Sequence, residues 1–144
     1  MRRRPEISAP TYGFLSRRDR LAFVKGLFDA DGSIVFSRKT YQEHEYPTIE
    51  IKTVSRELGL SVKDLLLLAG FRASLNKSAE SWVVRINGKA MLERWMEKIG
   101  SRNIKHLTRY LVWKKEGACP PKTMVRDRML ILEDWDMSSV VAKA

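Results

Sequence analysis

The sequence contains a single cysteine, Cys119, among 144 residues. One thiol cannot form a disulfide within the chain, and a zinc site built from cysteines is excluded for the same reason. The chain is therefore compatible with a reducing compartment. Glycine and proline are also sparse, at eight and five residues, which excludes collagen-like and low-complexity chains.

Long apolar runs are missing as well. The longest, DLLLLAG at 64–70, is far shorter than the roughly 20 residues that a membrane-spanning helix needs. The start, MRRRPEISAP, is basic but lacks the apolar core of a secretory signal. A transit peptide stays open, although Glu6 and Asp19 count against it. We therefore expect an intracellular protein, in the cytoplasm and nucleoid or an organelle matrix, that is not secreted and has no membrane partner.

Acidic residues are in the minority. The chain has 17 Asp and Glu residues and 27 Lys and Arg residues, which gives a formal net charge of +10. The positive charge is spread along the chain and is not gathered in one tail, so a polyanionic partner is favoured over basicity for solubility alone. The apolar share of 44% is enough for a core, and the length suits one compact domain.

Hydrophobic periodicity predicts the order helix, two strands, helix, two strands, helices. Ser16 can cap the first helix, with Asp19 in capping-box position, and Gly32 can end it. Asn87 and Asn103 are candidate caps of later helices. The expected elements are an N-terminal arm at 1–13, a helix from 17 to Gly32, a hairpin within 33–53, a helix at 55–69, a hairpin within 71–86, helices at 88–99 and 103–115, and an amphipathic segment at 124–135.

Four strands in two hairpins predict an α+β fold, with one antiparallel sheet and helices on one of its faces. The other face would collect polar and basic side chains, which is typical of either a solvated surface or a nucleic-acid reader. The net charge favours the reader, since Arg matches guanine, Asn matches adenine and Glu can accept from cytosine. The residues expected to contact DNA are Ser33, Val35, Ser37, Lys39, Tyr41, Thr48, Glu50, Lys52, Arg72, Ser74, Asn76, Ser81, Val83 and Arg85.

Two aspartates stand where the first helix is expected to end, within GLFDADGSIVF at 26–36. The segment VKGLFDADG at 24–32 resembles the nine-residue motif that names the LAGLIDADG homing endonucleases. Together with the αββαββα order, the resemblance covers an endonuclease core at 14–116, and 117–144 is then a C-terminal helical extension. Gly26, Leu27, Asp29, Ala30, Asp31 and Gly32 match the motif, Val24 and Phe28 are conservative changes, and Lys25 departs from it.

The resemblance implies an intron-encoded, magnesium-dependent DNA endonuclease, a phosphodiester hydrolase whose sheet forms a DNA-binding saddle. It implies cleavage of both strands across the minor groove with short 3′ extensions. The motif occurs once, and in this family one copy implies a homodimer that acts on a long pseudo-palindromic site. The residues agree, because Ala22 and Gly26 lie four apart on one shallow helix face where a second copy can approach closely, with Leu27 beside it.

A carboxylate pair beside DNA phosphates suits Mg²⁺, which prefers oxygen ligands and keeps positions for water and substrate. By resemblance, Asp31 is the catalytic metal ligand, one per subunit, and the Ala30 carbonyl adds a ligand, with Mn²⁺ or Ca²⁺ able to replace magnesium. Asp29 is expected to be structural. The other interpretation of this triplet is an ordinary polar helix end.

Two further catalytic positions follow from the resemblance. Thr53 occupies the place, at the end of the second strand, where the family often has a polar residue such as Gln. Lys105 best fits the family's basic residue, with Arg102 as second choice, although an ordinary solvated lysine is an equally open interpretation of Lys105.

The expected DNA span follows from strand length. Eight reading residues cover ~26 Å, about eight base pairs per subunit, so a dimer would read on the order of 16 to 20 base pairs. The alternative is a non-catalytic relative, either an intron RNA maturase, with RNA as partner, or a DNA-binding regulator. Intact Asp31 favours cleavage, whereas Thr53 and the unsettled basic residue keep the alternative open.

Overall fold

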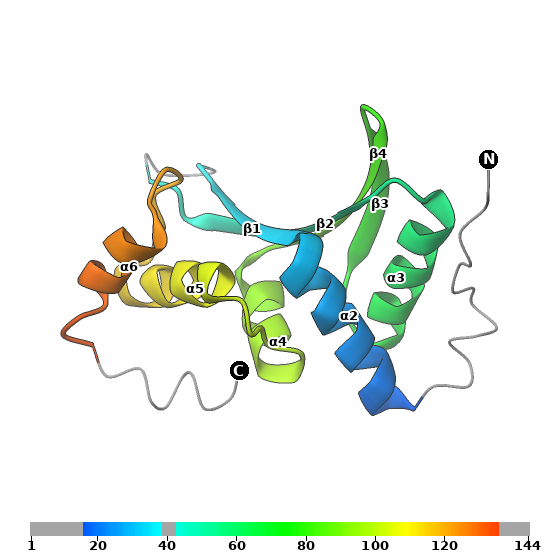
Figure 1. Cartoon of the computed structure of the whole chain (residues 1–144), viewed down its shortest axis with the longest axis horizontal. Coiled ribbons are helices and arrows are strands. Elements are labelled where there is room, and N and C mark those ends of the chain that lie inside the picture. The colour runs from blue at the N-terminus through cyan, green and yellow to red at the C-terminus, as the bar shows by residue number, and fades with distance from the viewer. Residues whose placement is uncertain (1–15, 39–42, 136–144) are drawn as a thin grey trace.

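The computed structural model describes residues 16–38 and 43–135. The expected N-terminal arm, Lys39, Tyr41 and the last part of the C-terminal extension lie outside these ranges. Helices and strands follow one another in the predicted order (Figure 1). They are α2 (Arg17–Asp31), β1 (Gly32–Ser37), β2 (Tyr46–Thr53), α3 (Arg56–Leu68), β3 (Ala73–Ser78), β4 (Ser81–Asn87), α4 (Lys89–Lys98), α5 (Ile104–Glu116) and α6 (Val125–Ile131).

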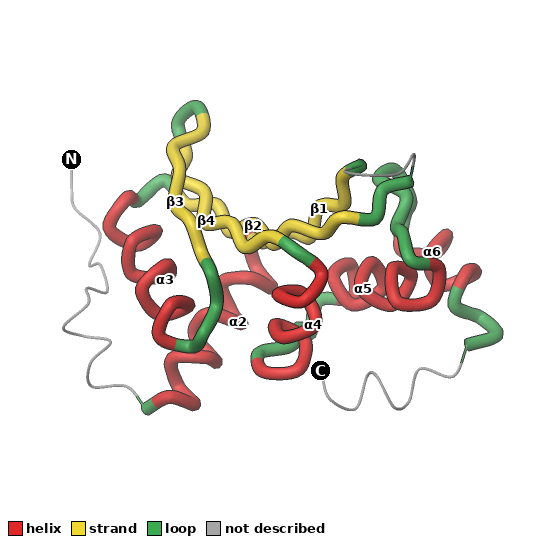
Figure 2. The backbone as a smooth tube through the Cα atoms, turned by 180° about the vertical axis from the view of Figure 1, so that it is seen from behind, coloured by secondary structure: helices red, strands yellow, loops and turns green. Residues whose placement is uncertain are grey.

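The strands form one antiparallel sheet in the order β1-β2-β4-β3. Each predicted hairpin is present, and the two hairpins join through β2 and β4 in the middle of the sheet. The sheet curves into a saddle, and the helices lie on the side away from its opening (Figures 1 and 2). The α+β fold expected from the strand pattern is confirmed.

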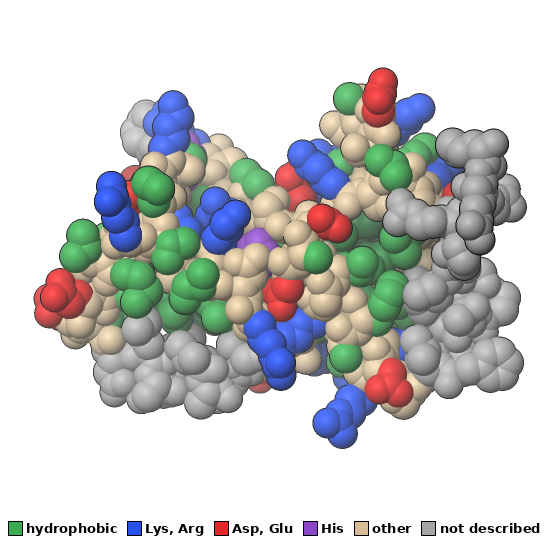
Figure 3. Space-filling view, viewed as in Figure 1, with side chains coloured by type: hydrophobic (Ala, Val, Ile, Leu, Met, Phe, Trp, Pro, Cys, Tyr) green, Lys and Arg blue, Asp and Glu red, His purple; other side chains and the backbone are tan. Residues whose placement is uncertain are grey.

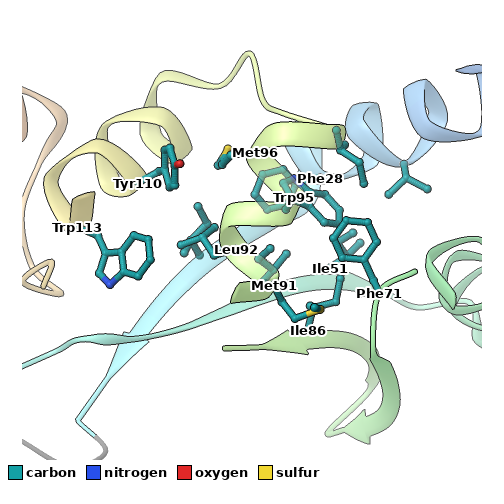
Figure 4. Packing of buried hydrophobic residues seen from close by; sticks show 14 of the residues in the cluster. Phe28, Ile51, Phe71, Ile86, Met91, Leu92, Trp95, Met96, Tyr110 and Trp113 are labelled. Atoms are coloured by element: carbon teal, nitrogen blue, oxygen red, sulfur yellow. The ribbon is translucent and has the colours of Figure 1, made fainter. Parts of the chain in front are cut away.

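The core lies between the sheet and the helices, and Trp95 of α4 is at its centre with no exposed surface. Phe28 of α2 and Phe71 before β3 contact the Trp95 ring edge-to-face, at centroid distances of 5.0 and 5.6 Å (Figure 4). Such aromatic pairs add stabilisation beyond the area they bury. Alternate strand residues complete the core, namely Ile34, Phe36, Ile49, Ile51, Val84 and Ile86.

The junction between α2 and β1 depends on Gly32. A Cβ at this position would lie 2.4 Å from Cδ1 of Phe28 and 2.7 Å from its carbonyl oxygen, so only glycine fits against the buried ring. At the other end of α2, the Ser16 hydroxyl accepts from the Asp19 backbone N–H at 3.1 Å, as predicted. The tight junction places Asp31, the last helical residue, next to the first strand pair of the saddle.

Most predicted helix caps are confirmed, but the Asn87 cap is wrong. Asn103 caps α5 through its side chain, as predicted, and Ser55, which was not predicted as a cap, caps α3 in the same way. Asn87 is instead the last residue of β4, where its Oδ1 accepts from the Thr48 hydroxyl at 2.9 Å. Gly88, with φ of +110°, begins α4 without a side-chain cap. A cross-strand partner therefore competes successfully with the local cap.

The described part of the C-terminal extension packs against the core. Leu132 and Cys119 are 1% exposed, and the Cys119 backbone N–H donates to the His44 carbonyl at 3.0 Å. Arg128 of α6 is also buried, and its Nε donates to the Thr108 hydroxyl of α5 at 2.8 Å. The helix itself, Val125–Ile131, is shorter than the predicted 124–135 segment. In the described ranges, no helix is both long and apolar enough to cross a bilayer.

Candidate nucleic-acid interface and catalytic site

The face of the saddle opposite the helices is lined by rows of side chains that cross the strands. We call this surface the reading face. One row joins Ser33, Glu50, Arg85 and Ser74, and a second joins Val35, Thr48 and Asn87. A third joins Lys52, Val83 and Asn76. The structure therefore gathers on one surface most of the described residues that the sequence predicts to contact DNA.

The reading face carries an ion pair near its centre. Arg85 Nε donates to Glu50 Oε2 at 2.8 Å, and both side chains are partly exposed. The pair fixes the direction of the guanidinium before any ligand arrives. Val83 differs from its neighbours, because its side chain has no exposed surface and cannot touch a duplex. Arg72 is exposed but lies just before β3, outside the ladder.

Asp31 and Asp29 have different surroundings. The Asp29 carboxylate accepts from the Ser101 hydroxyl at 2.5 Å and from the Arg102 backbone N–H at 2.9 Å. Asn103 Nδ2 donates to the Asp29 carbonyl at 2.9 Å. Asp29 therefore anchors the end of α2 to the α4–α5 connection. Asp31 is exposed, and its carboxylate makes no hydrogen bond or ion pair with any residue in the described ranges.

His106 of α5 also contacts the end of α2, through Phe28. Its ring lies 4.2 Å from the Phe28 ring between centroids, and its Nε2 is 3.1 Å from the Phe28 carbonyl, to which it donates. Nδ1 is buried and has no partner in the described structure. Burial lowers the pKa of His106 below its ordinary value of 6.5, although the Phe28 hydrogen bond and Asp29 oppose this shift. The imidazole is thus held neutral.

Thr53 and Lys105, the two other predicted catalytic residues, are placed differently. Thr53 is half-buried on the helix side of the sheet, and its hydroxyl oxygen accepts from the Ser55 backbone N–H at 3.1 Å. Lys105 is exposed in the first turn of α5, beside the Asn103 cap that contacts the end of α2. The structure therefore brings the Lys105 segment to the end of α2, and it gives the Thr53 hydroxyl a structural partner.

Lys52 has a position that the sequence gave no reason to single out within the predicted interface. Ile51 of β2 pairs with Gly32, the residue after Asp31. Lys52 follows Ile51 in β2 and therefore lies near the end of α2 that carries Asp31. Its side chain is exposed and belongs to the reading face. The position of Lys52 near Asp31 follows from the strand register, and the sequence alone does not determine that register.

One face of α2 is exposed and made of small residues. Ala22, Gly26 and Ala30 are spaced by four residues, and all three are exposed. A Cβ at Gly26 would meet nothing within 4 Å. Leu27, in contrast, is half-buried and packs against the core. In Figure 1, α2 runs down from the underside of the saddle, and Figure 3 shows the same side with basic side chains around the saddle.

Within residues 16–38 and 43–135, one subunit does not supply a full metal site. In the part of the chain that the structure describes, no three His, Cys, Asp or Glu side chains gather in a way that could hold a metal ion. The Asp31 carboxylate is nevertheless a hard oxygen ligand, and the neighbouring Ala30 carbonyl has no donor among the described residues. This donor set fits Mg²⁺ when substrate oxygens and water complete the shell.

Comparison with known proteins now adds to the geometry. Residues 19–100 match the family model described as a LAGLIDADG-like domain, which is more than half of the chain. The chain belongs to the LAGLIDADG family. The resemblance seen in the DAD motif is thereby confirmed, whereas a search of curated proteins returns no match.

Solved LAGLIDADG structures share this fold. The homing endonuclease I-CvuI, solved with the I-CreI target, aligns with a TM-score of 0.54 and 14% identity over 83% of this chain and 98% of its own. I-GzeII, solved with its DNA target, aligns with a TM-score of 0.51 and 18% identity over 85% of this LAGLIDADG chain and 40% of its own. I-SmaMI bound to cleaved DNA aligns with a TM-score of 0.49 and 23% identity over 67% of this chain. This chain spans about a third of the I-SmaMI chain (34%).

Proposed function

We propose that this LAGLIDADG protein is a site-specific, magnesium-dependent double-strand DNA endonuclease that acts as a homodimer. The observation that carries the proposal is the position of Asp31. Its carboxylate is exposed and without a described partner, next to the reading face and at the end of a helix with an exposed small-residue face. I-CvuI, which aligns over nearly its whole length, was solved with DNA, and we extend that partner to this chain.

The proposed dimer forms through α2. Small residues at Ala22, Gly26 and Ala30 allow the helix of a second copy to cross at close range, because no side chain keeps the backbones apart. A two-fold contact uses the same face of both chains. It therefore brings the two Asp31 carboxylates together beside neighbouring phosphates, and two saddles line up along one long pseudo-palindromic duplex.

Within each half-site, the Asp31 carboxylate and the Ala30 carbonyl would hold Mg²⁺. When bound, the ion supplies an activated water and stabilises the leaving oxygen of the cleaved phosphodiester. Lys105 places a positive charge near the end of α2, where it can stabilise charge that develops on the phosphate. Asp29 orients this segment through Ser101 and Asn103 and touches no reacting atom.

Recognition of the target is proposed for the reading face. Arg85 is oriented by Glu50, and Thr48 is oriented by Asn87, so these side chains present fixed groups to base edges. Lys52 is suited to a phosphate contact because it is exposed and cationic. Val83 is left out of this interface because it is buried. The remaining members are Ser33, Val35, Ser37, Arg72, Ser74, Asn76 and Ser81, with Lys39 and Tyr41 added from outside the described ranges.

The proposal is tested with a plasmid library that carries random insert sites. Purified protein is incubated with the library in magnesium, in manganese, in calcium and in excess chelator. We expect linear products with magnesium that share one sequence family, and none with chelator. Binding to duplex without any cleavage, in every metal, would contradict the nuclease proposal.

One observation favours a second candidate. The Thr53 hydroxyl oxygen accepts a backbone N–H and lies on the helix side of the sheet, so its contribution to a catalytic site is reduced. A non-catalytic relative, either an intron RNA maturase or a DNA-binding regulator, would keep the basic saddle and not need this hydroxyl. Competition between duplex DNA and structured RNA for the protein distinguishes a maturase, which would prefer RNA, from a DNA-binding regulator, which would prefer duplex DNA.

A further inference from the structure

Asn87 occupies a place where the local structure does not explain an asparagine. Asparagine is depleted in strands, yet Asn87 is the last residue of β4. It does not cap α4 either, because that helix begins at Gly88 without a side-chain cap. The side chain is exposed and belongs to the row of the reading face that also contains Val35 and Thr48. A binding role would explain the choice of residue.

A hydrogen bond fixes the Asn87 amide on the open face of the saddle. The Thr48 hydroxyl donates to Asn87 Oδ1 at 2.9 Å across the β2–β4 pair. A carbonyl oxygen can accept twice, so Oδ1 keeps one acceptor position. In the described ranges, Nδ2 of Asn87 has no hydrogen-bond partner. The amide therefore offers one acceptor and one donor, side by side, to a ligand.

Arg85 lies two residues earlier on the same strand and on the same face of the sheet. Its Nε donates to Glu50 Oε2 at 2.8 Å, and its two terminal nitrogens have no hydrogen-bond partner among the described residues. Ser33 and Ser74 stand at the two ends of this row, so Arg85 is the longest side chain in it. The end of the guanidinium is therefore available, whereas Glu50 is engaged.

The two available groups match different bases in the major groove. An asparagine amide pairs with adenine, because it donates to N7 and accepts from the N6 amino group. The terminal nitrogens of an arginine pair with N7 and O6 of guanine. Alternate strand residues are about 6.6 Å apart, roughly the rise of two base steps. Arg85 and Asn87 can therefore contact bases that lie within about two steps of each other.

We infer that Arg85 and Asn87 are specificity-determining residues, which read a guanine and an adenine within about two base pairs of each other. Glu50 and Thr48 are positioning residues, because they hold the guanidinium and the amide. The inference rests on the proposed function, since it names bases in the duplex that the reading face would bind. In a homodimer, the guanine and the adenine occur once in each half-site, as an inverted repeat.

The test selects bound duplexes, in calcium, from a pool with a randomised segment of about 24 base pairs, longer than the estimated site. Dissociation constants for the selected duplex and for its single-base substitutions then give the discrimination at each position. For the wild type, we expect one guanine and one adenine at this spacing in each half-site. Each should be preferred over the other bases by roughly 5- to 150-fold.

R85M and N87S are each expected to lose one of these preferences. R85M keeps an unbranched side chain without the guanidinium, so the guanine preference should fall below about threefold. N87S keeps a hydroxyl that can pair with Thr48 but lacks the amide, so only the adenine preference should fall in the same way. The matched control is R126M, which removes an exposed arginine of α6, outside the reading face. It should keep both preferences.

The positioning roles have variants of their own. T48V replaces the hydroxyl by a methyl group and releases the Asn87 amide, so the adenine preference should fall by about two- to tenfold. T48S keeps the hydroxyl and should restore it. E50A should lower the guanine preference by a similar factor, whereas E50Q keeps an oxygen for Arg85 Nε and should retain it. Partners that only stabilised the sheet would affect all positions equally.

The outcomes separate this inference from the proposed function. If the wild type selects one sequence family, and R85M and N87S select the same bases as strongly, only this inference is wrong. An equal loss of affinity for every sequence would also overturn it, because it indicates phosphate contacts. All selections are run below the melting temperature of each variant, so unfolding does not produce the loss. If the wild type binds no duplex, the proposed function is wrong as well.

Discussion

At the scale of single residues, two aspartates two positions apart have opposite surroundings. Successive helical residues turn by about 100°, so Asp29 and Asp31 point roughly 200° apart around α2. Asp29 therefore faces the α4–α5 connection and accepts two hydrogen bonds there, whereas Asp31 faces outward. Of the two residues, Asp29 holds the end of the helix and Asp31 leaves its carboxylate exposed.

Substitution of each aspartate by asparagine should separate these two environments. D29N loses one acceptor oxygen and places an amide against the Ser101 hydroxyl or the Arg102 N–H, so we expect a loss of about 1–3 kcal/mol in the free energy of unfolding. D31N removes no described contact and should change it by less than about 0.5 kcal/mol. Urea denaturation of both variants measures this. Equal stability of the two would contradict the anchoring role of Asp29.

His106 should make the protein sensitive to acid. Burial lowers the pKa of its folded form below 6.5, so below this pH the unfolded chain binds a proton that the folded chain excludes. Stability is then fully present above about pH 6.5 and falls as the pH drops toward the folded pKa. In H106Q, a neutral amide replaces the imidazole. Thermal melts between about pH 8 and 5.5 should show a smaller decline for H106Q, and an identical decline would contradict this role.

Residue-level prediction succeeded where the cause is local. The Ser16 and Asn103 caps follow from their own side chains and the next turn of helix. Asn87 failed because its cross-strand partner Thr48 is 39 positions away. The burial of Val83 could not be predicted from the sequence either. Strand alternation assigns Val83 to one face of the sheet but does not show which neighbours cover it.

At the scale of elements, α2 combines a buried side and an exposed small-residue side. Val24 and Phe28 are in the core, whereas Ala22, Gly26 and Ala30 are exposed. The proposed dimer uses this exposed side. The sequence could show that these residues share a face from their spacing alone, and the structure adds that no described element covers it.

A leucine at Gly26 should block dimer formation and spare the subunit. The added side chain meets nothing within the subunit, and helix propensity improves by roughly 0.8 kcal/mol relative to glycine. In the dimer it would separate the crossing helices, so we expect the dissociation constant to rise at least about tenfold, or ~1.4 kcal/mol. Sedimentation velocity measures this.

The matched control for this variant is A90L, at an exposed position of α4. A90L should sediment as wild type does. If the dimer dissociation constants of G26L and A90L were equal, the proposed crossing of two α2 helices would be wrong.

At the scale of the whole molecule, the described part of the C-terminal extension, up to residue 135, belongs to the core. Leu132 and Cys119 are buried, and Arg128 links α6 to Thr108 of α5. The sequence predicted a helix in this region but gave no docking site for it, because packing across more than 20 residues of chain depends on tertiary contacts. The hairpins and their polar face were predictable, since both follow from local alternation.

Two neighbouring leucines test this packing. Leu132 is 1% exposed and Leu130 is 67% exposed. L132A should lower the free energy of unfolding by about 2–5 kcal/mol, because it leaves a cavity in the core cluster to which Leu132 belongs. L130A should stay within about 0.5 kcal/mol of wild type. Denaturant unfolding of the full chain gives both values, and similar losses would contradict the packing of the extension.

The most direct test of the central claim compares cleavage and binding in D31N, on the site recovered from the plasmid library. The account predicts a loss of cleavage of about a thousandfold or more, or ~4 kcal/mol in the barrier, because a metal ligand is removed from each subunit. Affinity for the same duplex in calcium should stay within about threefold of wild type. Cleavage by D31N at near wild-type rate would contradict the account, and so would a collapse of binding that matched the loss of cleavage.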